Sequence, residues 1–316
     1  MRGEGQSSTR RLMQLLRPET SGGVAQAIAW FKPAPASDSH AASYGFSDAP
    51  VYSRLGPLEL KLAQKKQDVK RAQKLRYRVF YENGTAIADA ATMFARRDKD
   101  AFDRLCDHLL VLDHAAKPSL SGKQPVVGTY RLLRQEVAAA NQGFYTESEF
   151  DIADMMGRHP DLRFLELGRS CVLPRYRNKR TLELLWQGIW SYVRHHQIDV
   201  MIGCASFAGT DPERLALSLS FLHHYAAAPQ AWRARATSSR YVEMNRMVKQ
   251  AIDPKLALRQ QPPLIKGYLR LGAYIGEGAV IDYQFGTIDV LVVMPTASIK
   301  TRYIDHFGAD APREAA

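Results

Sequence analysis

The chain has 316 residues, of which 46% are hydrophobic and 24% are charged, as in an ordinary globular protein. A formal net charge of +11 indicates an acidic partner, for which nucleic acid, an anionic membrane surface and an acidic carrier protein all qualify. No run of about 18 apolar residues occurs, which excludes a helix that spans a bilayer. Cys106, Cys171 and Cys204 lie far apart without CxxC spacing, which predicts reduced thiols in a cytosolic protein rather than a zinc site or a disulfide framework.

The N-terminal stretch, residues 1–50, is rich in Ser, Ala, Pro and Gly, and we expect no packed fold there. Two segments within it have the pattern of short basic amphipathic helices, so the stretch is interpreted as either a disordered extension or an anchor to a membrane surface. It has no compact apolar segment before a small-residue cleavage site, which argues against secretion. We expect one domain over 51–308, elaborated at 226–308, and a disordered tail at 309–316.

Apolar spacing predicts a strand, a helix and a hairpin in the first half of the chain. Residues 58–62 alternate between apolar and polar side chains, as in a strand with one buried face. Residues 67–81 have apolar side chains at helical spacing and a basic opposite face, and a loop follows to about residue 97. Residues 108–113 and 125–133 predict two short strands that are joined through a Gly-Lys turn, which makes an antiparallel hairpin.

The central stretch of the chain is typical of a strand, a loop and a helix. Residues 164–173 are apolar and end before a proline, as in a buried strand, and a basic loop follows at 174–180. Unpaired amides and the positive end of the helix dipole meet at such a loop, so the arrangement favours a phosphate. The expected helix has one broad apolar face, formed by Leu182, Leu185, Trp186, Ile189, Trp190 and Val193.

The remaining elements complete a layered domain. Their expected ranges are a strand at 200–205, helices at 211–225 and 244–257, and strands at 267–274 and 289–294. Strands at both ends of the chain that flank two main helices predict an α+β domain with a mixed sheet.

Seven segments form a family pattern that extends from about residue 60 to the C-terminus. They are LRYRVFYENGTA (75–86), FDRLCDHLLVLD (102–113), VVGTYRLLR (126–134), FYTESEFDI (144–152), ELGRSCVLPRYRN (166–178), the helical pattern LWxGIxxY (185–192) and PPLIKGYLRLGA (262–273). This pattern resembles the ornithine–acyl-carrier-protein N-acyltransferases, which make lyso-ornithine lipid. They form a hemolysin-like branch of the GNAT superfamily of N-acetyltransferases, related to the acyl-homoserine-lactone synthases.

The resemblance implies a GNAT-like fold, in which helices flank a mixed, mostly antiparallel sheet. It also implies transfer of a 3-hydroxyacyl chain from acyl carrier protein to the α-amine of L-ornithine. The donor would be the 4′-phosphopantetheine thioester of the carrier, with no bound cofactor and no metal. The protein would lie at the inner face of the cytoplasmic membrane, on an anionic surface, without a nucleic acid partner.

Glu166 is the first candidate for chemistry, because it lies in an otherwise apolar strand. Burial there would favour a general base or a contact to an ammonium group. The alternative is a structural ion pair with Arg169. Residues three apart in a regular strand face opposite sides, but Gly168 between them favours a bulge that would rotate one toward the other.

Asp103 and Asp107 lie four residues apart, so on one helical turn they would share a face and suit a diamine such as ornithine. Spacing alone favours a solvated helix end, and the resemblance instead favours a substrate site. Arg131 in its strand needs an anion, which Glu166, the ornithine carboxylate or the thioester region would supply. Arg78 is a further candidate for substrate binding, because it lies in the RVF motif that both related families share.

A group of basic residues around the loop before the central helix is assigned to the donor. It departs from the usual pyrophosphate loop of the superfamily, because Asn178 and Arg180 stand where glycines are usual. That departure weakens coenzyme A as the donor and fits an acidic carrier protein. The residues are Arg175, Arg177, Lys179 and Arg180.

Two apparent motifs are set aside. His108 and Asp113 match an acyltransferase H-x4-D pattern, but an offset of five residues in a strand places them on opposite faces. His223 and His224 lack metal-ligand spacing and are expected to end a helix. The rival functions are an acyl-homoserine-lactone synthase and a non-enzymatic basic protein that binds membrane or nucleic acid.

Overall fold

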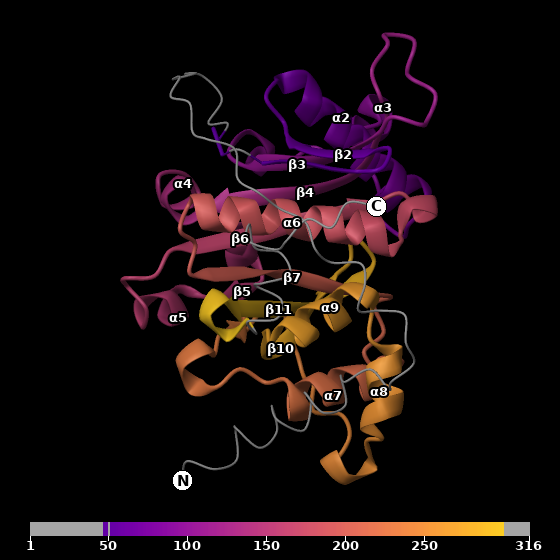
Figure 1. Ribbon diagram of the computed structural model, residues 1–316. Helices are drawn as coiled ribbons and strands as arrows, with labels where there is room; N and C mark the ends of the chain where they lie inside the picture. The colour runs from indigo at the N-terminus through magenta and orange to yellow at the C-terminus, as the bar shows by residue number, and fades with distance from the viewer. Residues whose placement is uncertain (1–46, 50, 300–316) are drawn as a thin grey trace, which may run out of the picture. The chain divides into compact units, whose positions relative to one another are not determined.

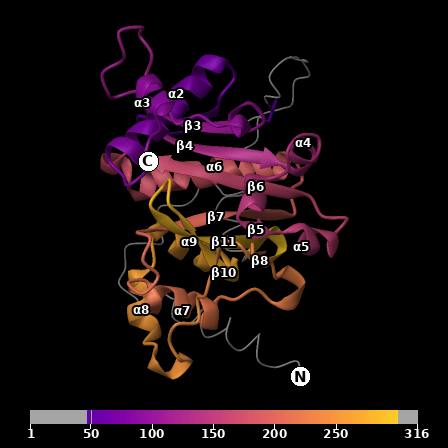
Figure 2. The same cartoon turned by 180° about the vertical axis from the view of Figure 1, so that it is seen from behind.

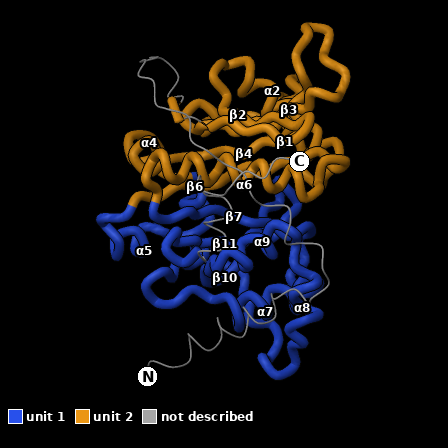
Figure 3. Tube along the Cα trace, viewed as in Figure 1, with its two compact units in different colours: residues 1–28, 145–162, 199–304 blue, residues 29–144, 163–198, 305–316 orange. Residues whose placement is uncertain are grey.

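The computed structural model describes residues 47–49 and 51–299 (Figure 1). The chain divides into two compact units, whose described parts are 145–162 with 199–299 in unit 1, and 47–49, 51–144 and 163–198 in unit 2 (Figure 3). The expectations for most of residues 1–50, and for the tail, lie outside the described residues. No helix within the described ranges is long and apolar enough to cross a membrane.

Unit 2 contains an antiparallel sheet in the order β1-β2-β3-β4-β6. The predicted hairpin is confirmed, because β3 pairs with β4 along its length. The predicted first strand is also present as β2, preceded by a short β1. The strands are β1 (Tyr52–Leu55), β2 (Leu58–Leu62), β3 (Asp107–Asp113), β4 (Val126–Arg134) and β6 (Phe164–Val172).

Two helices pack on opposite faces of the unit 2 sheet. Helix α2 (Lys66–Tyr77) contributes Val69 and Ala72 to a core cluster with Leu110. Helix α6 (Lys179–His195) places Gly188 against Leu60 and Leu109. Because Leu109 and Leu110 are neighbours in one strand, their side chains point to opposite faces, and so do the helices. Figures 1 and 2 show α6 in front of β4 and β6 in one view and behind them in the other.

Helix α6 forms as the sequence predicts, with one exception on its apolar face. Asn178 caps its N-terminus by accepting a hydrogen bond from the backbone N–H of Thr181 at 3.1 Å. Leu182 is 43% exposed, although we predicted it to be buried. A Cβ atom at Gly188 would lie 2.3 Å from Leu60 Cδ2, so glycine permits the close approach of helix and sheet. The buried apolar residues of the predicted face are Leu185, Trp186, Ile189 and Val193.

The remaining helical segments of unit 2 are short. Helix α2 continues directly into a π-helical turn, and the loop predicted after it contains one additional helix. The segments are η1 (Arg78–Glu82), α3 (Ala90–Ala95), η2 (Ala101–Arg104), α4 (Gln135–Ala139) and η4 (Pro174–Tyr176).

Unit 1 contains a mixed sheet in the order β7-β11-β10-β8-β5, with β9 also pairing with β10. Its pairs are antiparallel except β10 with β8, which is parallel. The strands are β5 (Phe150–Asp151), β7 (Val200–Ala208), β8 (Arg235–Ala236), β9 (Tyr241–Val242), β10 (Tyr274–Asp282) and β11 (Thr287–Pro295). The helical segments are η3 (Tyr145–Ser148), α5 (Ala153–Gly157), α7 (Ala216–Tyr225), η5 (Gln230–Trp232), η6 (Lys249–Ala251), α8 (Pro254–Gln260), α9 (Pro263–Leu271) and η7 (Thr296–Ser298).

Two predictions in unit 1 are wrong. Of the predicted helix at 244–257, only a short 3-10 turn and the first residues of α8 are helical, because α8 starts where Asp253 accepts hydrogen bonds from the next turn. The predicted strand at 267–274 is largely the end of α9. The reason is local, because Pro263 favours a helix start and Gly272, at φ 100°, ends the helix in the left-handed region.

The helix predicted at 211–225 is shorter at its N-terminus. Asp211 caps a turn by accepting from the N–H of Glu213 at 3.0 Å, but regular helix begins at Ala216. His223 and His224 lie in its last turn, as predicted. The C-terminal part of the prediction is therefore confirmed, and the first turn is wrong.

Candidate functional site

Arginines from three elements of unit 2, two of them buried and the third half-buried, meet aspartates of the segment that precedes β3. The arginines come from α2, β4 and β6, and they bring together parts of the chain that are far apart in sequence. We call this group the arginine–aspartate network. Its members are Arg76, Arg131, Arg169, Asp98, Asp100 and Asp103.

Arg76 lies at the centre of the network and is 0% exposed. Its Nη1 and Nη2 donate to the two carboxylate oxygens of Asp103, both at 2.8 Å. Its Nε donates to Asp98 Oδ2 at 2.7 Å, and Nη2 also donates to the Asp98 carbonyl at 2.6 Å. Such a bidentate arrangement uses the planar guanidinium fully and fixes both aspartates in position.

Arg131 and Arg169 share the third aspartate. Arg131 Nη1 lies 2.7 Å from both oxygens of Asp100 and 3.4 Å from Asp103 Oδ1. Arg169 Nη2 lies 3.2 Å from Asp100 Oδ2, and its Nε lies 3.3 Å from Asp98 Oδ2. The anions that Arg131 contacts are therefore Asp100 and Asp103 of the protein itself.

The electrostatics of the network keep its carboxylates ionised. Burial alone would raise the pKa of Asp103, but Arg76 and Arg131 outweigh burial and hold that pKa well below its usual range. Burial likewise opposes ionisation of Asp100, and Arg131 and Arg169 lower its pKa. The three arginines balance the three aspartates in charge, so the network is a rigid, self-compensated unit.

Strand β6 carries a bulge at the network. Arg131 of β4 lies opposite Gly168, whereas Thr129 lies opposite Cys171, so two residues of β6 face one residue of β4. Arg169 is one of them and has φ 50°, in the left-handed region. The predicted bulge is confirmed, and it turns Arg169 toward Asp98 and Asp100.

Glu166 precedes the bulge and is buried, opposite Leu133 of β4. Its charge contributes, after burial, to raising the pKa of the Cys106 thiol. Burial also raises the pKa of Cys171, so both thiols stay protonated and unreactive. The chain thus places one carboxylate inside a bulged strand, beside a network of fixed charges.

Comparison with known proteins gives the family. The sequence profile of the Acetyltransferase (GNAT) domain matches residues 75–187, a range that contains the whole network and the bulge. The L-ornithine N(alpha)-acyltransferase of Agrobacterium fabrum is 54% identical over 83% of this chain and 89% of its own length. The chain belongs to the L-ornithine N(alpha)-acyltransferase family.

Two further family members support this assignment. The protein of that name from Brucella abortus is 52% identical over 84% of this chain and 94% of its own length. The one from Rhizobium meliloti is 51% identical over 83% of this chain and 88% of its own length. The chain is therefore an N-acyltransferase with a GNAT domain, which confirms the predicted fold class and excludes the non-enzymatic alternative.

The structure separates the two aspartates that we had paired. Helix η2 ends at Arg104, and Asp107 begins β3, so Asp103 and Asp107 do not share a helical turn. Asp107 instead accepts from the Tyr192 hydroxyl at 2.6 Å and from the Ser47 N–H at 2.8 Å. Burial raises its pKa, whereas that of Asp103 is lowered. The predicted pairing on one face is wrong.

The buried arginine of the family segment 75–86 is Arg76 of α2, which the sequence analysis did not single out. The side chain of Arg78 is exposed, and Arg76, two residues earlier, is the buried one. Arg76 lies four residues after Ala72 and three before Val79, on the apolar face of the helix. This spacing was the signal that could have identified it. Asp98 and Asp100 were also missed, since nothing local distinguishes them from other loop acids.

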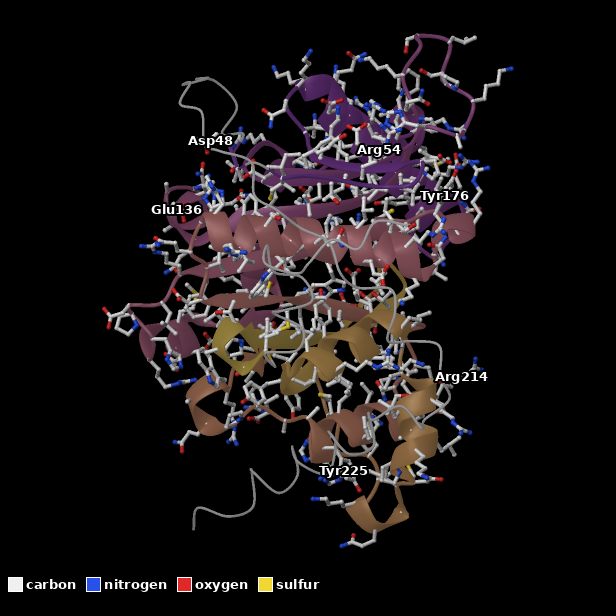
Figure 4. All side chains as sticks on the ribbon, viewed as in Figure 1. Asp48, Arg54, Glu136, Tyr176, Arg214 and Tyr225 are labelled. Atoms are coloured by element: carbon white, nitrogen blue, oxygen red, sulfur yellow. The ribbon has the colours of Figure 1, made fainter. Side chains whose placement is uncertain are left out.

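The four basic residues assigned to the donor are all exposed, as expected of a surface that contacts a partner, and Lys179 and Arg180 belong to the first turn of α6. Arg177 Nε donates to the Val172 carbonyl, and Lys179 lies 3.4 Å from Glu183. Tyr176, labelled in Figure 4, donates its hydroxyl to Asp113 at 2.6 Å, and Arg175 lies 4.9 Å from its ring centre. These contacts fix the backbone of the loop and leave its guanidinium and ammonium groups on the surface.

Proposed function

We propose that this chain transfers a 3-hydroxyacyl chain from the phosphopantetheine thioester of acyl carrier protein to the α-amine of L-ornithine. The product would be lyso-ornithine lipid. The observation that carries the proposal is the shared name of relatives that are 51–54% identical over at least 83% of this chain. Identity at this level, over most of both chains, supports a shared reaction as well as a shared fold.

In the reaction, the neutral amine attacks the thioester carbonyl, the new C–N bond forms and the C–S bond breaks. The amine loses a proton and the thiol leaves with one, so a nearby base is needed. We assign this role to Glu166, because it is a buried carboxylate on the bulged strand. Arg169 is assigned to the same centre, held by Asp98 and Asp100.

The backbone of residues 167–171 is proposed to stabilise the oxyanion of the tetrahedral intermediate. The bulge interrupts the regular ladder with β4, and bulges often re-aim groups beside active sites. Preorganised amides that face the developing negative charge provide a large share of catalysis in acyl transfer. Because Arg131 and Arg169 fix the flanking strands through Asp100, the amides would need little rearrangement.

Ornithine recognition in unit 2 is proposed to involve the exposed Arg78 as the cation for its carboxylate, with Arg131, which Asp100 and Asp103 already engage, as a positioning residue. The oxygens of Asp103 are already engaged by Arg76, and those of Asp107 by Tyr192 and Ser47. Asp103 and Asp107 would therefore act as positioning residues.

The donor is proposed to dock on the exposed basic loop. Acyl carrier proteins are acidic, and their prosthetic group has one phosphate, which suits the N-terminus of α6. The net charge of +11 also suits peripheral binding at the anionic inner face of the cytoplasmic membrane, where an amphiphilic product would accumulate. The donor-docking residues are Arg175, Arg177, Lys179 and Arg180, all of them exposed.

Mass spectrometry of lipid extracts tests the function. Cells that make no ornithine lipid would express this chain, with the empty vector as control. We expect a new lyso-ornithine lipid that contains a 3-hydroxyacyl amide on the α-nitrogen. Expression of folded protein without any acylated ornithine would contradict the proposal, and an acylated amino acid other than ornithine would correct the substrate.

A further inference from the structure

Helix α3 of unit 2 lies outside the core, because none of its six residues is buried. Its sequence, AATMFA, contains no charged residue. Phe94 is 95% exposed, Met93 is 60% exposed, and Ile87 in the loop before the helix is 70% exposed. Single exposed apolar residues are common, but several in one short segment mark a surface that contacts a partner or a membrane. We call Ile87, Met93 and Phe94 the apolar tip.

The protein holds α3 in a defined position although its side chains do not enter the core. Asp89 caps the N-terminus by accepting from the backbone N–H of Thr92 at 2.6 Å, and Arg96 ends the helix in the left-handed region at φ 47°. The Arg96 guanidinium lies 6.0 Å from the ring centre of Tyr77 in α2 and pairs with Glu82 of η1. The apolar tip is therefore displayed by an anchored segment, beside the C-terminal end of α2.

A row of cations follows the solvent-facing side of α2. Lys66, Lys70 and Lys74 are each four residues apart, so they lie on one face of the helix, and all three are exposed. We call these three residues the lysine row. Arg78, the first residue of η1, continues it at the same spacing and is also exposed. The opposite face of α2 packs on the unit 2 sheet, so the row points away from the core.

The apolar tip and the lysine row belong to neighbouring helices, which Figures 1 and 2 show side by side. The exposed acids of residues 66–99 are Glu82, which pairs with Arg96, and Asp89, which caps α3. Both acids are engaged by the protein itself, and the exposed cations outnumber them, so this surface is positively charged. The exposed cations of the same range are Lys66, Lys70, Lys74, Arg78, Arg96 and Lys99.

An anionic lipid surface matches this combination better than a protein partner does. Lysine is depleted in protein–protein interfaces, whereas lysines and arginines beside exposed apolar side chains are typical of helices that bind anionic membranes. The cations would contact lipid phosphate groups. Phe94 and Met93 would enter the boundary between headgroups and acyl chains, where apolar faces are buried about 5–10 Å deep.

We propose that the apolar tip and the lysine row form a face that docks on an anionic membrane, with Phe94 and Met93 inserted among the lipids. The inference assigns to named residues the membrane contact that the net charge suggests for the whole chain. It rests on the proposed function for its purpose, since an amphiphilic product would pass from the enzyme into the bilayer. Arg78, proposed above to bind the ornithine carboxylate, continues the lysine row, so the acceptor would be bound close to the lipid surface.

Vesicle flotation in the absence of substrates tests the docking face. The full chain is mixed with vesicles of phosphatidylglycerol and phosphatidylcholine in equal parts, or of phosphatidylcholine alone. We expect the parent to float with the anionic vesicles, and Phe94→Ser to lower its partition coefficient about 10-fold through lost apolar burial. Lys70→Gln combined with Lys74→Gln should lower it about 10- to 30-fold at low salt, because two cations leave the surface.

Unit 1 provides a matched control for each change. Val248→Ser removes an apolar side chain that is 67% exposed. Lys255→Gln combined with Arg259→Gln removes two exposed cations of α8 that are also four residues apart. Both controls should bind the vesicles as the parent does. All four variants should keep the melting temperature of the parent, because every changed side chain is exposed.

Four results would overturn the proposal. Parent-like binding by both unit 2 variants removes this face from the membrane, and weaker binding by the unit 1 controls alone moves the contact to that unit. A dimer of the parent in sedimentation experiments that Phe94→Ser abolishes assigns the apolar tip to a second copy of the chain. A higher KM for acyl carrier protein without vesicles, in the double lysine variant, assigns the lysine row to the carrier. Flotation requires no turnover, so its result is independent of whether the proposed reaction is correct.

Discussion

Three aspartates lie together in unit 2 and three carboxylates lie together in unit 1, yet their surroundings differ. Arg76, Arg131 and Arg169 lower the pKa values of Asp103 and Asp100 in the arginine–aspartate network. In the acidic cluster of unit 1, which consists of Glu149, Asp282 and Asp289, burial and the neighbouring carboxylates raise the pKa of Glu149. Clustered acids alone therefore do not identify a ligand site. What distinguishes the two groups is whether the protein already supplies their counter-ions.

The largest expected effect concerns Glu166, the carboxylate that we propose as the base and that belongs to neither group. Glu166→Gln keeps the volume of the side chain and removes its charge, so kcat should fall about 10²- to 10⁴-fold with the KM of the donor little changed. Thermal melting and kcat, measured on one preparation, check this. A lower melting temperature with normal turnover per folded molecule would assign Glu166 to a structural role instead.

Breaking the arginine–aspartate network should cost stability. Arg76→Met leaves Asp98 and Asp103 without their main counter-ion, so the free energy of unfolding should fall by about 3–5 kcal/mol. Urea unfolding gives the value. Arg78→Met, at the exposed arginine of the same motif, is the control and should change it by less than about 0.5 kcal/mol. Equal losses in the two variants would show that the network is not the stabilising element.

The acidic cluster should respond to pH in the opposite sense to the network. The pKa of Glu149 is raised from 4.5 to about 7, so the folded protein holds a proton there that the unfolded chain has lost. Its contribution to stability therefore decreases as pH rises from 4.5 through 7, by on the order of 3 kcal/mol. Asp103, whose pKa is lowered, instead contributes stability that is lost only in acid.

Glu149→Gln should consequently stabilise the protein at pH 8 and leave it nearly unchanged at pH 5, because glutamine does not titrate. Urea unfolding of the variant and the parent from pH 5 to pH 8 measures the difference. A constant difference across this range would mean that Glu149 has an ordinary pKa and that the cluster is not strained.

The smallest effect concerns the exposed basic loop, whose charges the protein leaves on its surface. Arg175→Glu combined with Arg180→Glu should raise KM for acyl carrier protein several-fold, since each exposed ion pair provides about 0.2–1 kcal/mol. The dependence of KM on salt should become shallower. Arg214→Glu, at an exposed arginine of unit 1 that is labelled in Figure 4, is the control. A variant that matches the parent would remove this loop from the donor site.

Local patterns predicted much of the fold. Alternation identified β2, short apolar segments identified β3, β4 and β11, and helical spacing identified α2 and α6. Gly168 correctly predicted the bulge of β6. The errors in unit 1 arose where a proline–proline pair and Gly272 defined α9 within a segment that we had assigned to a strand.

The candidate sites were harder to predict, because they depend on contacts that spacing does not reveal. Arg76 could have been found from its position on the apolar face of α2. Glu149, Asp282 and Asp289 come from three segments of the chain that only the folded sheet brings together. A carboxylate site for a diamine was expected at Asp103 and Asp107, and the structure shows both engaged by other side chains.

NMR titration of ¹³C-labelled glutamate and aspartate carboxyl groups tests the contrast between the two groups most directly. The Glu149 signal is assigned by its loss in Glu149→Gln. We predict that it titrates near pH 7. Asp103 should stay ionised throughout this range. A Glu149 carboxyl that titrates near 4.5 would contradict the raised pKa of the acidic cluster, and an Asp103 carboxyl that titrates in this range would contradict the lowered pKa of the network.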